Sequence, residues 1–531
     1  MRLFTNARRT SAATAVVCVA ALVTASTGTV AEAKAKPAKQ HPPKSSKEFR
    51  KAVTVRGVAQ HLDALQAVAD ANGGTRASGT PGYTASRQYV VQKLRAAGYR
   101  PTVQAFEFPY FSEDEAAVLA RTSPSPKTYA SPADFATMTF SGSGDTTAPV
   151  VAVDTDLAGS ASSTSGCEAA DFASLPDGAI ALMQRGTCSF AVKTANAEEA
   201  GASAVIVFNR GVSVDGDDGT GVLQGTLGEP GTGIPAVGTS FAVGQELGAA
   251  GTEARVSTTT TNEVRTTYNV IAETRRGNPD NVVMLGAHLD SVGEGPGIND
   301  NGSGSAMNLE IAEQLAKVKK PANKVRFAWW GAEELNLLGS EHYVADLAEN
   351  NPDALGDIAL YLNFDMVASP NFVRFVYDGD GSLGDPATDA GPEGSAEIES
   401  IFAKYFAGQS LPSAETAFDG RSDYGPFIAE NIPAGGLFTG AEGIKTAEEA
   451  ATYGGTAGAP YDPCYHQACD TRENISLPAL DQMSDAAAHA VWVLSRSTKV
   501  VNGQRTGHVE KKVSRKARLA TVAEVSGRVR R

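Results

Sequence analysis

The segment GAHLDSVGEGPGINDNGSG, residues 286–304, combines metal-capable side chains with a glycine-rich backbone. His288 follows an apolar run, and Asp290 and Asp300 lie on either side of a loop that contains most of the segment's five later glycines and its proline. Imidazole nitrogens and carboxylate oxygens are ligands for zinc, and glycine lets a chain turn tightly beside an ion. The segment therefore predicts a loop that carries metal ligands.

Further metal-capable side chains follow other apolar runs that are typical of strands. Glu333 and Glu334 follow RFAWW, and Asp365 follows LYLNF. His466 lies in the segment YDPCYHQACD. Taken singly, such residues have ordinary explanations: a histidine after a strand is commonly a core or surface residue, an Asp-Asn pair a turn, and adjacent glutamates at a helix start favour the helix dipole.

As a set, these side chains are better explained by one metal centre. The set is His288, Asp300, Glu333, Glu334, Asp365 and His466. The ligands exceed what one catalytic zinc needs, so two ions that share a carboxylate are the simplest prediction. Asp290 lies two residues after His288, on the same side of an extended segment, and is expected to hold the other imidazole nitrogen of that histidine.

Hydrophobic periodicity predicts the elements that must position this set. TYNVIAET and NVVMLGAHLD predict two paired strands separated by a Gly-Asn-Pro-Asp turn. Further strands are expected in PTVQAFEFPYF, KVRFAWW, IALYLNFDMV and AGGLF, and helices over about residues 55–68, 84–97, 305–317, from near 334, and over 480–494. Strands that alternate with helices predict an α/β fold whose mostly parallel sheet is covered on both faces.

Composition changes between about residues 113 and 262, where Gly, Ser and Thr dominate. Within this stretch, Asp177–Asn209 predicts a strand, a turn, a helix ending at Gly201 and a second strand. The string RGTCSFAVKTANAEEAGASAVI resembles the protease-associated domain, a β-rich module inserted in many exported peptidases. The resemblance implies a module without catalytic residues that guides or restricts substrates; a spacer or stabilising module is the alternative.

The first residues have the layout of a secretory signal. Arginines precede a mostly apolar run over residues 12–23, and the small-residue site Ala31-Glu32-Ala33 follows. The run is too short to span a bilayer, so a secreted, extracellular protein without stable membrane insertion is expected.

Charge is unevenly distributed along the chain. The net charge is −14, and most bases lie near the two ends, so the middle is strongly acidic. An acidic core argues against a nucleic-acid partner. The basic C-terminal stretch is best explained as a solvated extension that is trimmed after export.

Four of the five cysteines follow the signal segment and allow three pairings. We expect the two local pairs, Cys167 with Cys188 and Cys464 with Cys469. A cysteine-rich metal site lacks the close CxxC spacing it would need.

Several motifs together resemble the family of aminopeptidase S and the leucine aminopeptidase-like zinc exopeptidases, secreted bacterial enzymes with two zinc ions. They are AHLDSV, GINDNGSG, WWGAEELNLLGS, YLNFDMV, GRSDYGPF, FTGAEG and YDPCYHQACD. The resemblance covers about residues 53–110 and 262–498 and implies a zinc-exopeptidase sandwich. It implies His288 and Asp365 on one zinc, Glu334 and His466 on the other, and Asp300 bridging both.

The resemblance also implies the roles of other residues. Glu333 would be the general base, Tyr465 would stabilise the oxyanion, and Arg421 would line the place where the substrate's amino end docks. Met366 and Phe438 are candidates for an apolar side-chain pocket. Some relatives also bind Ca²⁺, which is kept here as a further cofactor without assigned residues.

The sequence therefore predicts a secreted, monomeric zinc aminopeptidase that acts on peptide or protein N-termini and prefers large apolar residues such as Leu. The alternatives are a carboxypeptidase or another exopeptidase of the same fold, a single-zinc cyclase, and a non-catalytic receptor-like homologue. The complete ligand set counts against the last two. The predicted division is a signal peptide (1–33), a linker or propeptide (34–52), a first peptidase part (53–112), the insert (113–262), a second, catalytic peptidase part (263–498) and the basic extension (499–531).

Overall fold

The computed structural model describes residues 42–214, 216–318, 320–384 and 390–503. The predicted signal peptide, part of the predicted linker and most of the basic extension lie outside these residues. Within the described ranges, no helix is both long enough and apolar enough to cross a membrane.

A mixed α/β fold is built on the main sheet, which has the strand order β13-β12-β14-β11-β9-β10-β8. Its inner strands β14, β11, β9 and β10 are parallel, which confirms the predicted fold class. The strands are β8 (Glu253–Glu273), β9 (Asn278–His288), β10 (Asn323–Trp330), β11 (Ile358–Phe364), β12 (Phe375–Tyr377), β13 (Ala414–Thr416) and β14 (Ala434–Phe438).

One predicted pairing is wrong. Strands β8 and β9 follow each other in the sequence, but β10 lies between them in the sheet. Phe327 of β10 is opposite Leu285 in a parallel pair with β9 and opposite Ala272 in an antiparallel pair with β8. The chain reaches β10 through a helical crossover, as parallel neighbours require, and a local turn signal cannot reveal that insertion.

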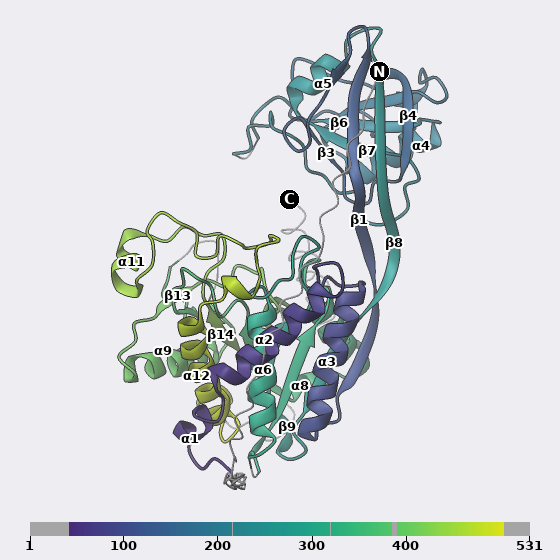
Figure 1. The fold of residues 1–531 in the computed structure, drawn as a ribbon. Coiled ribbons are helices and arrows are strands. Elements are labelled where there is room, and N and C mark those ends of the chain that lie inside the picture. Colours follow the sequence, from purple (N-terminus) through teal and green to yellow (C-terminus); the bar gives the residue numbers. More distant parts are fainter. Residues whose placement is uncertain (1–41, 215, 319, 385–389, 504–531) are drawn as a thin grey trace, which may run out of the picture. The chain divides into compact units, whose positions relative to one another are not determined.

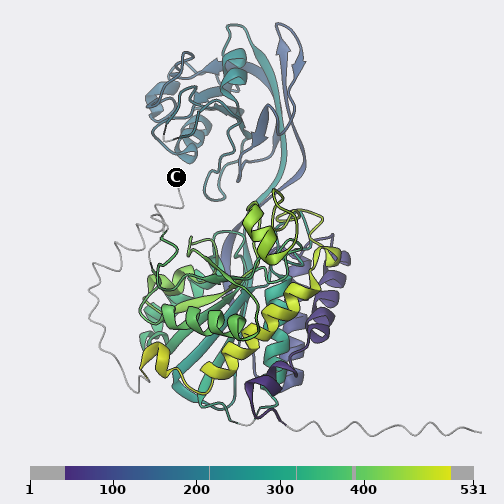
Figure 2. The same cartoon turned by 90° about the vertical axis from the view of Figure 1, so that its left-hand side faces the viewer.

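Helices cover both faces of the main sheet (Figure 1). Alternate strand residues point to opposite faces, so Leu285 and Phe327 join one core, and Met284 and Ala328 join the other. The first core includes α1 (Ser46–Arg50), α2 (Val55–Asp70), α3 (Pro81–Ala97), α6 (Gly302–Leu315), α9 (Ser395–Gly408), α12 (Leu477–Leu494) and α13 (Lys499–Asn502). The second includes α7 (Leu338–Asn350), α8 (Pro352–Gly356) and α10 (Gly425–Ala429). Figure 2 shows α12, in yellow, beside the N-terminal helices in purple.

Helix α6 starts at the end of the glycine-rich loop and is buried from its first turn. The side chain of Asn301 caps it by accepting a hydrogen bond from the amide of Gly304 at 2.9 Å. A Cβ at Gly304 would lie 2.1 Å from the carbonyl oxygen of Phe364. Glycine at this position therefore lets the loop and α6 approach the end of β11.

The strands of the insert continue the sheet beyond β8, with which β4 pairs antiparallel. Strands β4, β5, β6 and β7 are parallel, and β3 pairs antiparallel with β7 at the edge. Its elements are β2 (Lys127–Thr128), β3 (Phe135–Thr137), β4 (Gly144–Ala152), β5 (Ile180–Gln184), α4 (Phe190–Glu199), β6 (Ala204–Phe208), β7 (Ala236–Thr239) and α5 (Phe241–Leu247). The strand–helix–strand order predicted between Asp177 and Asn209 is confirmed, and Cys167 is bridged to Cys188.

Two long strands connect the insert to the main sheet. Strand β1 (Thr102–Ser123) pairs antiparallel with β8 from Thr102 opposite Ile271 to Ser123 opposite Glu253. The predicted limits of the insert, 112/113 and 262/263, therefore fall inside continuous strands.

Part of the segment predicted as a linker is folded. Helix α1 buries Phe49, whose ring lies 5.5 Å from that of Trp492 in α12. The predicted extension likewise begins with α13, which buries Val501.

Candidate metal centre

The predicted ligands come together at the carboxyl ends of parallel strands. His288 is the last residue of β9, Glu333 and Glu334 follow β10, and Asp365 follows β11. Parallel strands end at the same sheet edge, so chain direction alone brings these side chains together. Asp300 and His466 reach the same place on loops.

Asp300 lies between the two imidazoles. Its Oδ1 is 3.2 Å from Nε2 of His288, and its Oδ2 is 3.2 Å from Nε2 of His466. Each oxygen therefore faces a different histidine, which is the arrangement expected of a carboxylate shared by two ions.

The remaining carboxylates divide between the two histidines. Oδ1 of Asp365 is 3.3 Å from Nε2 of His288, and Oε2 of Glu333 is 3.7 Å from the same nitrogen. Oε2 of Glu334 is 3.0 Å from Nε2 of His466. The adjacent glutamates thus face different imidazoles.

Several buried carboxylate oxygens in and around this group of side chains have no hydrogen-bond partner among the described residues. They are Oε1 of Glu334, Oδ1 of Asp365, Oδ2 of Asp290 and both carboxylate oxygens of Asp423. Buried anionic oxygens without partners are costly, and a divalent cation supplies the missing interaction. The oxygen and imidazole donor set therefore fits zinc.

The site holds a surplus of buried carboxyl groups. Burial raises the pKa of Glu333 well above its ordinary value, and burial together with the charge of Asp300 raises the pKa of Glu334 to about 8. Burial likewise raises the pKa of Asp423 to about 8. Burial opposes ionisation of Asp300 too, but His288 and His466 hold its pKa below the ordinary value. Cations bound among these groups would relieve the surplus.

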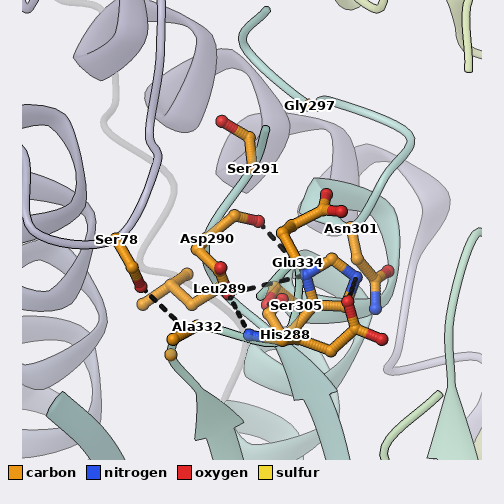
Figure 3. Close-up of polar contacts among 12 residues, drawn as sticks. Ser78, His288, Leu289, Asp290, Ser291, Gly297, Asn301, Ser305, Ala332 and Glu334 are labelled. Carbon is orange, nitrogen blue, oxygen red and sulfur yellow. Dashed lines mark hydrogen bonds and ion pairs between the residues drawn. The ribbon is translucent and has the colours of Figure 1, made fainter. Parts of the chain in front are cut away.

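Asp290 contacts His288 differently from the prediction (Figure 3). Nδ1 of His288 lies 3.2 Å from the backbone carbonyl oxygen of Asp290 and 3.7 Å from its carboxylate Oδ1. That Oδ1 accepts a hydrogen bond from the amide of Glu333 at 3.3 Å. Strand β9 ends at His288, so the extended geometry behind the prediction stops there.

Glu333 and Glu334 lie in a turn, so the prediction of a helix that begins near Glu334 is wrong; α7 begins at Leu338. Ala332, Asn336 and Leu337 have φ values of 55°, 70° and 61°, which no right-handed helix contains. From this turn, the side chain of Glu333 points toward His288 and that of Glu334 toward His466.

The loop that carries His466 is attached to the glycine-rich loop. Cys464 and Cys469 are bridged, as predicted. The carboxylate of Asp470 accepts hydrogen bonds from the amides of Asn299 and Asp300, both at 2.9 Å. Asp462 accepts one from the side chain of Asn299 at 2.6 Å. The predicted set of site residues does not include these two aspartates, although they flank His466 in the motif YDPCYHQACD. It also does not include Asp423 of the motif GRSDYGPF.

A cavity of about 240 Å³ opens beside the predicted ligands. Met366 and Phe438, the two predicted pocket residues, both line it. Phe375 and Tyr461, which were not predicted, also line it and form an aromatic wall with Phe438. The ring centroid of Phe375 lies 6.0 Å from that of Phe438 and 5.4 Å from that of Tyr461.

Arg421 and Tyr465 also line this cavity. The guanidinium of Arg421 donates to Glu442 at 2.7 Å and to the hydroxyl of Tyr465 at 3.1 Å. The Tyr465 ring stacks on that of His466, with centroids 3.9 Å apart. Burial raises the pKa of Tyr465, so its phenol stays protonated and able to donate.

Comparisons with known proteins show similarity to aminopeptidases. The model of Peptidase family M28 matches residues 269–491, and that of the PA domain matches residues 146–247. An aminopeptidase of Pseudomonas aeruginosa is 49% identical over 464 residues, which cover 87% of this chain and 85% of that protein. Leucine aminopeptidase 2 of Trichophyton rubrum is 39% identical over 461 residues, which cover 85% of this chain and 86% of that protein.

Solved structures extend the similarity. The aminopeptidase from Aneurinibacillus sp. strain AM-1 has a TM-score of 0.61 at 28% identity, covering 87% of this chain and 99% of that one. BSAP, a zinc aminopeptidase from Bacillus subtilis, has a TM-score of 0.55 at 25% identity, and the match covers 85% of this chain and 98% of that one.

Proposed function

The chain belongs to peptidase family M28 and is a zinc-dependent aminopeptidase, and from this premise we propose that it uses two zinc ions to release large apolar residues such as leucine from N-termini. The observation that carries the proposal is the position of Asp300, with one carboxylate oxygen toward each of two histidines.

The proposed zinc ligands fall into two groups that share Asp300. His288 and Asp365 would hold one ion, and Glu334 and His466 the other. When bound, zinc polarises a carbonyl group and lowers the pKa of water.

The protein's own groups then move and hold protons. Glu333 is buried beside the ligands and accepts the proton of the attacking water through its carboxylate. It returns that proton to the leaving amine. The hydroxyl of Tyr465 donates a hydrogen bond to the oxygen that becomes negative in the tetrahedral state.

The lining of the cavity supports recognition of two substrate features, a free amino end and an apolar first side chain. Carboxylates of the cavity lining that hold no proposed ion, Asp419 and Glu442, attract an α-ammonium group. Met366, Phe375 and Phe438 supply apolar surface for the first side chain. The name leucine aminopeptidase, carried by a relative, agrees with this preference.

Secretion and the predicted division of the chain belong to the same proposal. The two disulfides support an oxidising compartment, where such bonds persist. Within the insert we assign no catalytic residue, and its role in guiding substrates stays a prediction, as does a calcium ion.

The experiment uses purified protein, leucine anilide, alanine anilide, N-acetyl-leucine anilide and a peptide blocked at its N-terminus. We expect the leucine substrate to be preferred, both blocked substrates to be inert, and a chelator to abolish hydrolysis until zinc is restored. Metal analysis should give two zinc ions per chain. Cleavage of the blocked peptide would refute the aminopeptidase, and one zinc at full activity would refute the two-zinc site.

A further inference from the structure

Arg76 is a fully buried cation without an ion pair among the described residues. It lies in the connection between α2 and α3, more than two hundred residues before the glycine-rich loop that carries Asp300. A buried charge normally needs a carboxylate partner, so its surroundings call for an explanation.

The guanidinium of Arg76 joins two segments that carry proposed ligands. Its Nε donates to the carbonyl oxygen of Pro296 at 2.7 Å, and Nη2 donates to that of Gly297. Nη1 donates to the carbonyl oxygen of Leu289, the residue after His288. One planar group thus holds the end of β9 and the loop that leads to Asp300.

Neighbours of Arg76 strengthen the same attachment. The amide of Arg76 donates to Oγ of Ser291 at 3.0 Å, and Oγ1 of Thr75 donates to the carbonyl oxygen of Val292 at 2.8 Å. Ser78 accepts a hydrogen bond from the amide of Ala332, the residue before Glu333, at 2.7 Å (Figure 3). Residues 75–78 therefore contact the backbone at three places: directly after His288, in the loop that leads to Asp300, and directly before Glu333.

Nearby acids explain how the charge is tolerated. Burial lowers the pKa of Arg76 to about 10, and Asp290, Asp470, Asp300 and Glu334 oppose that effect. The guanidinium consequently stays charged at neutral pH and offsets part of the site's negative charge.

We propose that Arg76 is a positioning residue that sets the spacing between His288 and Asp300 and so determines how tightly the ion at the His288 side is held. This inference rests on the proposed two-zinc function. Arginine suits this place because its planar fork offers five donors in fixed directions, whereas lysine presents all its donors from one nitrogen.

The test measures zinc affinity by chelator competition in the full-length wild type, Arg76→Lys and Arg76→Met, together with kcat and KM for leucine anilide. Arg50→Lys is the matched control, because Arg50 bonds Tyr405 and Asp485 away from the loop that carries Asp300. We expect both Arg76 variants to bind the ion at the His288 side about 10–100-fold more weakly, the usual effect of losing a group that orients a ligand. The ion at the His466 side should be weakened less, because it shares only Asp300 of the two proposed ligands whose segments Arg76 holds.

Catalysis provides a second readout. In subsaturating zinc, kcat should fall while KM stays near the wild-type value, because the lining of the side-chain pocket is unchanged. Saturating zinc should restore much of the loss.

Each outcome decides the proposal. Wild-type affinity for both ions in folded Arg76 variants would overturn it. If Arg76→Met does not fold, Arg76→Lys decides, and failure of both to fold also contradicts it, because Arg76 would then serve the core as a whole. A wild type with fewer than two zinc ions contradicts the proposed function instead, whatever the variants do.

Discussion

Nη2 of Arg421 donates a hydrogen bond to the hydroxyl oxygen of Tyr465 at 3.1 Å. Because the guanidinium occupies an acceptor position of that oxygen, the phenolic proton is free to point elsewhere, and both residues line the cavity. Glu442 holds the other end of the guanidinium at 2.7 Å. Arg421 thus orients a donor, which is more specific than the docking role expected from resemblance.

Tyr465→Phe should lower kcat by about 10²–10³-fold, the usual cost of losing a donor to a developing oxyanion. Zinc content should stay unchanged, because the phenol lies outside the proposed ligand set. Steady-state kinetics beside metal analysis checks both. Arg421→Met should cost less, about tenfold, and should add little to the Tyr465→Phe variant because the two residues act as one unit. Fully additive losses would argue against that link.

The adjacent glutamates should respond differently to the same substitution. Glu333→Gln should keep both zinc ions and lose about 10²–10⁴-fold in kcat, the range for loss of a general base. Glu334→Gln should weaken one zinc, because a neutral amide is a poorer ligand than a carboxylate. Zinc titration and kinetics on both variants make the comparison. Two variants with full zinc and near-normal turnover would show that the centre is misassigned.

The bridge between Cys464 and Cys469 should matter locally. It closes a short loop with a sequence separation of 5, so it removes little entropy from the unfolded chain, but it shapes the turn that carries Tyr465 and His466. Replacing both cysteines by serine should therefore lower kcat or zinc occupancy more than Tm.

The bridge between Cys167 and Cys188, with a separation of 21, gives the matched control. Its double serine variant should lose stability in the insert and keep its zinc. The reverse pattern between the two variants would contradict the local role of the first bridge.

His61 should make stability depend on pH outside the metal centre. Burial, followed by the charge of Lys93, lowers its pKa to about 4 from an ordinary 6.5. Between these values the unfolded chain binds more protons than the folded one, so stability falls as pH drops from about 6.5 to 4, by up to about 3 kcal/mol.

Denaturant unfolding of wild type and His61→Gln between pH 7 and 4 measures this contribution. The variant should lose less stability than the wild type over that range. Glu310, whose pKa burial raises, faces position 61 in both proteins, so its own contribution to the pH dependence largely cancels in the difference. Parallel curves would show that His61 does not titrate as stated.

The strands, and the positions of most proposed ligands directly after them, depend on local patterns that the sequence contains. Residues such as His288 and Asp365 follow apolar runs, and parallel strands end at one edge. The insertion of β10 between β8 and β9, and the turn at Glu333, depend on pairing and packing that no short window contains. Arg76 and Asp470 were not predicted for the same reason, because each contacts the segment of His288 and Asp300 from a distant part of the chain.

The pairing of β1 with β8 has a consequence for the order of folding. The two strands are separated by the whole insert, so they cannot pair during synthesis until the insert has left the ribosome. Closing so long a disordered loop is slow, but an insert that folds first brings Ser123 and Glu253 together and leaves the strands to zip from that end. An insert that folds first would therefore help to form the side of the main sheet where β1 and β8 adjoin β10, independently of any effect on substrates.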